Sequence, residues 1–308
     1  MKLSLFDLHC DTAGEILRQQ QGLENNTLAV SLQKAKVFER YIQVMAHWTP
    51  YSLDDEAGWD VFLRMNENLR KDPAVTKGKA ILSACCPAED HLPSLLLAVE
   101  DVRILAEKLD RVDTLYQMGV RIVTPMWRGE TCIGGSHDTE AGLTPFGKQA
   151  LRRMVSLGII PDVSHASVAS TSQILDIAEE QGRPVIASHS NAHAICPVSR
   201  NLRDDQIRAI VRSNGLIGLN LFTAFLKEDG IATAEDLLPH IEHFLSLGAQ
   251  RHLALGCDMD GCDLPPDIPD LSALPHLAEL LLRHNYAEEL VQDLFYNNAY
   301  AFASQYIK

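Results

Sequence analysis

Eight short apolar runs, most of them unbroken by polar residues, constrain the fold of this chain more than any other feature. The runs lie at residues 3–9, 41–48, 94–100, 121–127, 158–165, 183–190, 216–222 and 252–258. Unbroken apolar runs are typical of strands that are buried on both faces of a parallel sheet. Stretches with helical spacing of apolar residues separate many of the runs, as at residues 101–119. Strands and helices that alternate in this way predict βα units.

Eight βα units in a chain of 308 residues favour a closed (β/α)8 barrel of the TIM type over an open doubly wound sheet. Neither of the glycine-rich phosphate motifs, GxGxxG and GxxxxGKS/T, follows any of the runs. No internal repeat or long linker divides the chain, and the proline-rich stretch at 264–276 is predicted to be a loop over one barrel end. We therefore expect an α/β fold in which residues 1–308 form a single barrel domain.

The charge balance argues against nucleic acid and membrane partners. The chain has 27 Lys and Arg against 41 Asp and Glu, for a formal net charge of -14. Binding nucleic acid regardless of its sequence requires a basic surface, and docking on anionic lipid also favours positive charge. No run approaches the ~20 apolar residues of a membrane span. The N-terminus has only about five apolar-leaning residues before Asp7, fewer than the roughly 7–15 residues in the apolar core of a signal peptide.

Cysteine usage bears on the cellular compartment. The seven cysteines are irregularly spaced and form no CxxC pair. Neither a disulfide framework nor a structural zinc knuckle is therefore suggested. We expect reduced thiols and a cytoplasmic location.

Polar residues with metal-binding side chains end five of the eight apolar runs. They are His9, Asp11, Glu100, His165, His189 and Asp258. In a barrel of this type the carboxyl ends of all strands meet at one face, where active sites lie. A single residue of this kind is more often a cap or a turn residue. Six of them at the ends of five predicted strands indicate a shared site.

The residue types in this set predict a metal centre. Three imidazoles and three carboxylates offer the nitrogen and oxygen ligands that divalent cations such as Zn²⁺ accept. His9 and Asp11 are two positions apart, so in a strand both face the same side, whereas Cys10 faces away and is expected to pack in the core. With one carboxylate shared, the set could hold two metals roughly 3.5–4 Å apart and a bridging hydroxide.

Two further residues near the end of the sixth run are candidates for substrate contacts. Arg200 lies in the loop after that run, where a solvent-facing arginine is the ordinary outcome. The alternative is an anchor for a substrate carboxylate, which matches the bidentate geometry of guanidinium. His193 lies close to His189 and could line the site. Most other histidines, His137 among them, are expected on loops or helix surfaces.

Four stretches together resemble the membrane (renal) dipeptidases, a family of dinuclear zinc peptidases with a barrel fold. They are "DLHCDT", "IPDVSH", "PVIASHSNAHAICPVSRNLRDDQI" with the following "NGLIGLNLF", and "LALGCDMDG". They extend from residue 6 to about residue 262 and so span most of the chain. The order of the HxD, DVSH and SHSN…RN elements is specific, whereas any one of them alone would be weak. The resemblance implies the barrel architecture of a metal-dependent hydrolase.

The resemblance also implies a role for each site residue. His9 and Asp11 would bind one zinc ion, His165 and His189 the other, and Glu100 would bridge the two. Arg200 would hold the C-terminal carboxylate of the substrate. Asp258 would lie near the scissile amide and the free amino group, and counts with Glu100 as catalytic. A homodimer is compatible with the resemblance, although no interface can be identified in the sequence.

The chain departs from the family pattern at two positions. Asp101 follows Glu100 where the family usually has glycine. Trp127 stands where many members have a histidine that contacts the scissile carbonyl oxygen. Its indole N–H could donate one hydrogen bond to the substrate but cannot become a cation, so oxyanion stabilisation would rest more on the metals.

Three functional hypotheses follow from these residues. The first is a dipeptidase with two Zn²⁺ ions, in which a metal-bridged hydroxide attacks the peptide bond and Asp258 carries the proton to the leaving amine. A D-configured C-terminal residue is left open. The second is a metal-dependent hydrolase of another small amide, a lactam or an N-acyl amino acid. The third is a non-catalytic metal-binding barrel.

Overall fold

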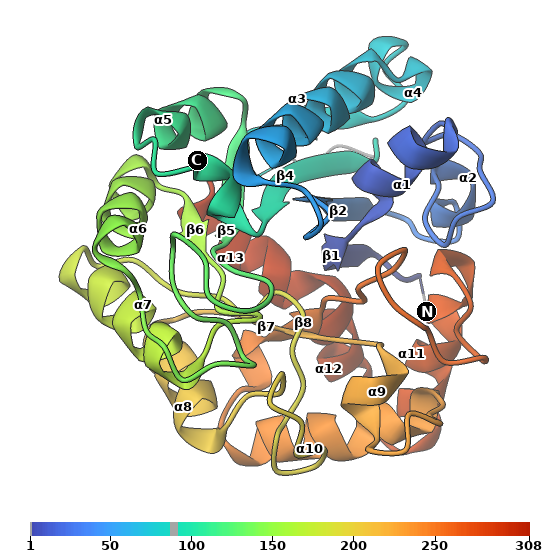
Figure 1. The fold of residues 1–308 in the computed structure, drawn as a ribbon. Coiled ribbons are helices and arrows are strands. Elements are labelled where there is room, and N and C mark those ends of the chain that lie inside the picture. The colour runs from blue at the N-terminus through green and yellow to red at the C-terminus, as the bar shows by residue number, and fades with distance from the viewer. Residues whose placement is uncertain (1, 87–91) are drawn as a thin grey trace.

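Parallel strands curl into one sheet in the computed structural model, which describes residues 2–86 and 92–308 (Figure 1). The strands are β1 (Leu5–Cys10), β2 (Tyr41–Trp48), β3 (Ile81–Ser83), β4 (Ser94–Glu100), β5 (Val120–Thr124), β6 (Ile160–Pro161), β7 (Ile217–Leu219) and β8 (Leu253–Leu255). Their order is β6-β5-β4-β2-β1-β8-β7, and β3 pairs with β4 beside this path. The pairing of β1 with β8 brings the first and last strands of the sequence side by side.

Residues 183–190 do not form the regular strand that their apolar run predicts. They make isolated parallel bridges only, from Ile186 to Asp162 and from Ala187 to Ile217. A β-carbon on Gly218 or Gly256 would lie 1.9 or 1.7 Å from the backbone oxygen of Ser188. The Ser188 carbonyl thus fills the space where two side chains would stand, and the segment leaves the ladder. The named strands therefore form a curled sheet rather than the closed barrel predicted.

Helices follow most of the strands and surround the sheet (Figure 1). They are α1 (Thr12–Gln19), α2 (Leu32–Ala35), α3 (Asp55–Lys71), α4 (Pro73–Thr76), α5 (Asp110–Gln117), α6 (Pro145–Leu157), α7 (Val168–Glu180), α8 (Asp204–Arg212), α9 (Thr223–Leu226), α10 (Leu238–Ser246), α11 (Leu274–Arg283), α12 (Glu288–Gln292) and α13 (Asn298–Tyr306). The sequence sets several of their ends. Helix α6, for example, has Thr144 as its N-cap, proline in its first turn and Gly158 at its C-terminus with φ 91°.

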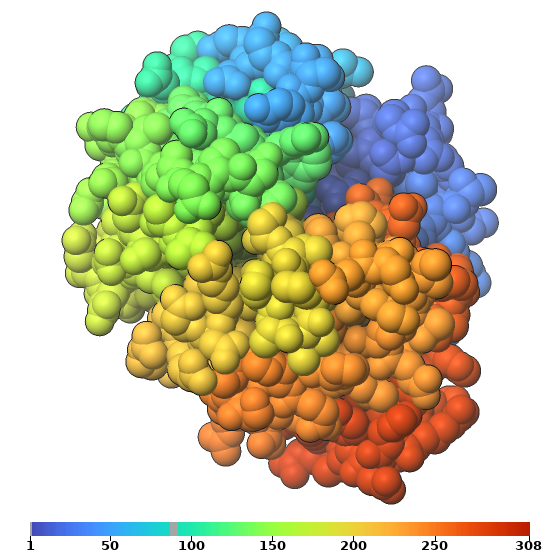
Figure 2. Space-filling view, turned by 60° about the horizontal axis from the view of Figure 1, so that its bottom comes forward, coloured from blue at the N-terminus to red at the C-terminus, as the bar shows by residue number. Residues whose placement is uncertain are grey.

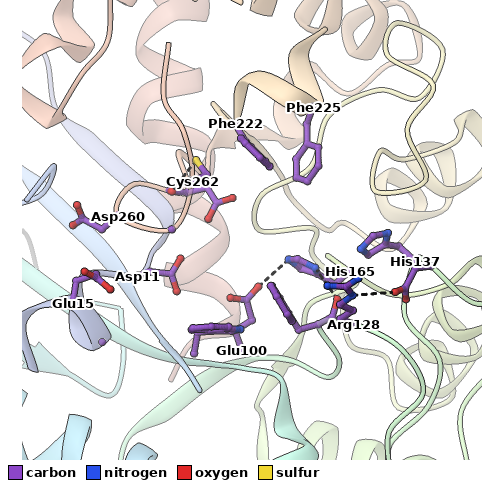
Figure 3. Close-up of a pocket in the computed structure, with 16 residues that line it drawn as sticks. Asp11, Glu15, Glu100, Arg128, His137, His165, Phe222, Phe225, Asp260 and Cys262 are labelled. Atoms are coloured by element: carbon purple, nitrogen blue, oxygen red, sulfur yellow. Dashed lines mark hydrogen bonds and ion pairs between the residues drawn. The ribbon is translucent and has the colours of Figure 1, made fainter. Parts of the chain in front are cut away.

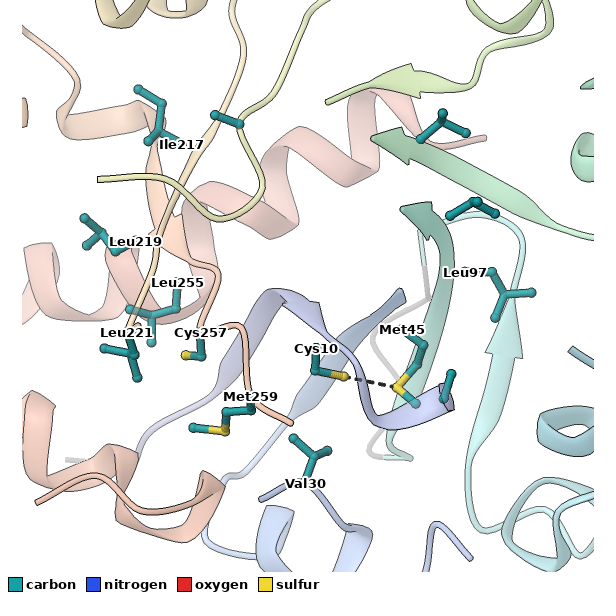
Figure 4. Close-up of a cluster of buried hydrophobic side chains, with 14 of the residues drawn as sticks. Cys10, Val30, Met45, Leu97, Ile217, Leu219, Leu221, Leu255, Cys257 and Met259 are labelled. Carbon is teal, nitrogen blue, oxygen red and sulfur yellow. Dashed lines mark hydrogen bonds between the residues drawn. The ribbon is translucent and has the colours of Figure 1, made fainter. Parts of the chain in front are cut away.

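Alternation along the strands separates two hydrophobic clusters. Every second residue of β1, β2 and β4 faces the inside of the curled sheet, as Ile42 and Val44 or Leu96 and Ala98 do. Helix α13 closes this inner cluster with residues such as Phe302, and Figure 1 shows α13 behind the strands. The other residues face the surrounding helices in a larger outer cluster, part of which is drawn in Figure 4.

An irregularity in β1 sets the direction of the first site residues. The register between β1 and β2 shifts between Asp7 and Cys10, which is the signature of a β-bulge. Cys10 is fully buried in the outer cluster with its Sγ 3.5 Å from Met45 Sδ (Figure 4), as expected from its spacing. His9 and Asp11 on either side of it point to the inner face, at the carboxyl end of the sheet.

Segments that are far apart in the sequence also meet at the surface. The segment around Ala29 packs on residues 260–271, where Asp260 accepts a hydrogen bond from Ala29 N at 2.6 Å and Leu271 N donates to Ala29 O at 3.1 Å. Figure 2 shows these blue and orange segments side by side. Among the described residues, no helix has both the length and the apolar character needed to cross a membrane.

Candidate metal centre and substrate pocket

The structure brings all six strand-end residues together at the carboxyl end of the sheet. His9 lies in β1 and Glu100 is the last residue of β4, while the others lie in the turns just after β1, β6, residues 186–187 and β8. Figure 3 shows Asp11, Glu100 and His165 converging at the floor of a pocket. Their donor atoms form three overlapping groups, each within 4.8 Å: His9, Asp11 and Glu100; Glu100, His165 and His189; and His9, His189 and Asp258.

Glu100 lies between the two sets of ligands. Its Oε2 is 3.6 Å from His9 Nε2, and its Oε1 is 2.9 Å from His165 Nε2 and 3.4 Å from His189 Nε2. On the other side of His9, Nε2 lies 3.6 Å from Asp11 Oδ2 and 3.9 Å from Asp258 Oδ1. One carboxylate can therefore serve both halves of the group, as the bridging role requires.

Unpartnered polar atoms within this group indicate that it is built to hold a cation. His9 Nε2, Asp11 Oδ1 and Glu100 Oε1 are buried, and none of them has a hydrogen-bond partner among the described residues. A buried polar atom without a partner costs roughly 1–3 kcal/mol, so three of them within one group of metal-binding side chains need an explanation. Metal ions bound by the two halves of the group would satisfy them.

The ring orientations of His165 and His189 also indicate a cation site. Their Nε2 atoms lie 3.0 Å apart. His165 Nδ1 is 3.1 Å from the Trp127 carbonyl, which can only accept, so the proton of this ring is on Nδ1. His189 Nδ1 is likewise engaged by Ser188 Oγ at 2.7 Å. Two nitrogen lone pairs then face each other at 3.0 Å, which favours a cation between them.

Burial and mutual charge perturb every titratable group in the centre. Burial lowers the pKa of His189 well below its usual value, aided by the positive charges of His9 and Arg200. Burial acts in the same direction on His9, but Glu100 and Asp11 outweigh it and raise its pKa well above the usual value. Burial raises the pKa of Asp258 to about 7, and the nearby carboxylates of Asp11 and Glu100 add to this effect against the opposing charge of His9.

The backbone is strained at three positions of the centre. His165, Asp258 and Asp101 have φ of 68°, 60° and 68°, in the left-handed region that residues with a side chain rarely adopt. At Asp101 this conformation is the one that glycine, the residue expected here from the family resemblance, adopts without strain. Aspartate is among the residues that tolerate the left-handed region best. Asp101 also accepts hydrogen bonds from Arg103 N and Nε at 3.3 and 3.0 Å. The replacement therefore leaves Glu100 in the position that the centre needs.

A pocket of about 540 Å³ opens above the six residues. Its apolar lining is aromatic: it includes Trp48 and Trp127, and also Phe222 and Phe225, which lie side by side in Figure 3. The Trp48 and Trp127 ring centroids are 5.2 Å apart in an edge arrangement, so the two indoles support each other. The hollow is visible between the green and yellow segments in Figure 2. Trp127 thus lines the pocket, as expected from its position in the sequence.

Arg200 and His193 lie beside this pocket rather than among its lining residues. Arg200 is 4% exposed, which excludes the solvent-facing alternative. Its Nη1 donates to Ser190 Oγ and its Nη2 to the His189 carbonyl, both at 2.9 Å, while Nε is buried without a partner in the described chain. With His193, it lines an adjoining cavity of about 90 Å³.

No sequence pattern indicated that His137 belongs to the site. This residue was expected on a loop or helix surface, and it does lie on a loop, but its ring points into the pocket (Figure 3). The ring centroid is 5.9 Å from that of His165, and His137 also lines the cavity beside Arg200. No strand precedes His137 directly, so the strand-end pattern could not identify it. Asp162 and Ser188 were also missed as site residues, although they lie within the quoted stretches "IPDVSH" and "PVIASHSNAHAICPVSRNLRDDQI".

Comparisons with known protein families and with related proteins point to one family of dipeptidases. The model of the membrane dipeptidase family, peptidase family M19, matches residues 1–305. An uncharacterised protein of Klebsiella pneumoniae, from the pqqA 5' region, is 34% identical over 199 residues, which cover 61% of this chain and 72% of that protein. An uncharacterised dipeptidase of Schizosaccharomyces pombe is 29% identical over 212 residues, 65% of this chain and 50% of its own length.

Two solved structures resemble the whole chain. A metallopeptidase from Rhodobacter sphaeroides, with a phosphinate mimic of the dipeptide L-Ala-D-Ala, is 26% identical with a TM-score of 0.91, and 100% of each chain is covered. A dipeptidase of family M19 is 27% identical with a TM-score of 0.92, over 100% of this chain and 99% of its own.

Proposed function

We propose a substrate class and a division of roles for this chain on the premise that it belongs to the membrane dipeptidase family, peptidase family M19, and is a metallo-dipeptidase. One observation carries the proposal. Six nitrogen and oxygen donors converge at the floor of a pocket, and three of them present buried atoms without a partner. The pocket of about 540 Å³ is of a size that suits a dipeptide rather than a folded protein.

The metal is proposed to be zinc, with two ions per chain. His9 and Asp11 would hold one ion, His165 and His189 the other, and Glu100 would be shared by both. Mixed imidazole and carboxylate ligands suit Zn²⁺. When bound, the two ions supply Lewis acidity, which activates a water molecule near neutral pH and polarises the scissile carbonyl.

Asp258 is proposed to move the proton during hydrolysis. Asn220 Nδ2 donates to Asp258 Oδ2 at 3.0 Å, and this contact fixes the carboxylate so that Oδ1 faces His9. A carboxylate held at this place can accept the proton of the attacking water and deliver it to the leaving amine. Because Asn220 also donates to the His189 carbonyl at 3.3 Å, one amide orients both the acid and the backbone of a proposed ligand.

The substrate is proposed to enter with its C-terminal carboxylate toward Arg200. The buried, unpartnered Nε of Arg200 supports this role, since a guanidinium nitrogen without an acceptor is costly to bury. His193, in the cavity beside Arg200, would line that end of the substrate site. Trp127 and the facing phenylalanines would contact the substrate side chains. The D-alanine in the mimic bound by the Rhodobacter sphaeroides protein supports tolerance of a D-configured C-terminal residue.

We also propose three general features of the molecule: its barrel closure, its single domain and its cellular location. Residues 183–190 would complete a (β/α)8 barrel without forming a regular strand, as supported by their bridges to Asp162 and to Ile217 in β7. The single sheet that joins β1 to β8 supports one domain over residues 1–308. All seven cysteines lie in the described part of the chain and none of them forms a disulfide bond, which supports a cytoplasmic location.

A panel of dipeptides tests the proposal. The pure protein should hydrolyse L-L and L-D dipeptides with a free C-terminus, should lose this activity with a chelator, and should regain it with zinc. Equal rates on free and amidated C-termini would count against Arg200 as an anchor, and would favour a broader amide or N-acyl amino acid hydrolase. Two bound zinc ions without turnover of any amide would favour a non-catalytic barrel.

A further inference from the structure

A buried hydroxyl lies between two imidazoles from different halves of the metal centre. Ser188 Oγ is 2.7 Å from His189 Nδ1 and 3.5 Å from His9 Nδ1. Ser188 is 1% exposed and both histidines are equally buried, so water does not compete for these contacts. The nitrogens that Ser188 contacts are the ones turned away from the centre.

The direction of the hydroxyl proton is set by Asp162. Its Oδ1 accepts from the backbone N–H of Ser164 at 2.9 Å and of Ser188 at 2.8 Å. Its Oδ2 accepts from Thr124 Oγ1 at 2.6 Å and from Ser188 Oγ at 2.5 Å. Asp162 is fully buried, and four donors therefore occupy its four acceptor positions. The Ser188 proton points at the carboxylate, and the hydroxyl lone pairs face the imidazoles.

We propose that Asp162 and Ser188 are positioning residues that fix the tautomers of His189 and His9. An oxygen that has already given its proton to Asp162 can only accept from the rings. Each ring must then carry its proton on Nδ1 and present an unprotonated Nε2 to the centre, which is the form that binds a metal. The inference rests on the proposed function, because it concerns the same metal centre.

Asp162→Asn is the sharpest test, because it keeps the shape and changes the donor pattern. An amide that still accepts from the two backbone N–H groups places its NH₂ at the Ser188 hydroxyl. The hydroxyl must then accept from the amide, and its proton turns toward His189 Nδ1. The favoured tautomer becomes the one with the proton on Nε2, where it blocks the metal. We expect zinc affinity to fall 10–100-fold, in line with other residues that support metal ligands.

Ser188→Ala and Thr124→Val complete the set. Ser188→Ala removes only one oxygen and should weaken zinc binding at both sites, since the hydroxyl contacts a histidine from each. Thr124→Val is the matched control: it removes a similarly buried hydrogen bond to the same carboxylate oxygen, but Thr124 contacts neither imidazole through its hydroxyl. The zinc affinity of Thr124→Val should stay within about threefold of the parent. This change is much smaller than the 10–100-fold loss expected when a residue that orients a metal ligand is replaced.

Two measurements on each variant decide the question. Zinc affinity and stoichiometry are obtained by competition with a chromophoric chelator. The tautomers are obtained from ¹⁵N chemical shifts of labelled histidine in the metal-free protein, a signature that a purely structural defect would not change in this way. The parent should show a neutral Nδ1–H ring at His189, and Asp162→Asn should shift this ring to Nε2–H. Ser188→Ala keeps the test open if Asp162→Asn does not fold.

The outcomes separate this inference from the proposed function. A parent protein that binds no zinc would contradict the metal centre itself. A parent that binds two zinc ions, together with folded Asp162→Asn and Ser188→Ala proteins that bind them as tightly and keep the parent tautomers, would overturn the positioning role alone. Equal losses in Thr124→Val would also overturn it, because the effect would then follow from packing around Asp162.

Discussion

Asp258 should destabilise the metal-free protein, and its replacement by asparagine should therefore stabilise it. The carboxyl is buried beside Asp11 and Glu100, which together with burial raise its pKa from 3.8 to about 7. Between these two values the folded state binds more protons than the unfolded state. By linkage, the contribution of this group to stability then falls as pH rises from about 3.8 to about 7. Asp258→Asn removes the titration but keeps the acceptor for Asn220.

The size of the effect follows from the shift. A shift from 3.8 to about 7 corresponds to a cost of about 4 kcal/mol when the group is ionised in both states. At pH 5 the carboxyl lowers the stability of the folded protein by only about 2 kcal/mol, because it is still protonated in the folded state there. The stabilisation of Asp258→Asn over the parent should therefore grow by about 2–3 kcal/mol between pH 5 and pH 8.

Urea denaturation of chelator-treated protein at pH 5 and pH 8 measures this difference. Asp138→Asn serves as the control, because hydrogen bonds from Ser136 and Gly129 outweigh partial burial and lower the pKa of Asp138. Its loss of stability should be the same at both pH values. A gain for Asp258→Asn that is absent, or that shrinks as pH rises, would refute the reasoning. The same variant should lose about 10²–10⁴-fold in kcat if Asp258 moves the proton.

Three further predictions concern other parts of the molecule. Burial lowers the pKa of His47 to about 4, so stability should fall by about 3 kcal/mol as pH drops from 6.5 to 4, and His47→Gln should remove this part of the acid sensitivity in urea titrations. Arg200→Lys should raise KM about 10–100-fold for dipeptides with a free C-terminus but not for their amides, since it loses a charged hydrogen bond worth about 1.5–3 kcal/mol. Trp127→Ala should raise KM for dipeptides with large apolar side chains more than for Ala-Ala, because an aromatic pair contributes about 0.5–1.5 kcal/mol beyond its buried area; equal effects on both would contradict a wall contact.

The strand ends could be predicted from the sequence because they follow simple rules. Buried parallel strands appear as apolar runs, and the carboxyl ends of such strands share one face. His9, Glu100 and Asp258 could therefore be placed together although up to 249 positions separate them. The two-residue spacing of His9 and Asp11 also placed Cys10, which lies between them, correctly in the outer core.

The remaining features depend on backbone detail that periodicity does not encode. Residues 183–190 have the composition of a strand, but the approach of the Ser188 carbonyl to Gly218 and Gly256 is a tertiary contact between distant segments. The left-handed backbone at Asp101, which glycine adopts most easily and which the hydrogen bonds to Arg103 help an aspartate to adopt, cannot be foreseen from the sequence. His137 enters the pocket from a loop whose path is set by packing rather than by pattern.

Zinc titration into the metal-free protein, followed by the rate of L-Ala-D-Ala hydrolysis, tests the dinuclear centre most directly. The rate should be near zero in the chelated protein, should rise with added zinc, and should saturate at two equivalents per chain. In Glu100→Gln, which weakens the group shared by both halves, two equivalents should no longer restore the rate. Full activity in chelated protein that contains no bound metal would contradict the dinuclear centre, as would a rate that saturates at one equivalent of zinc per chain.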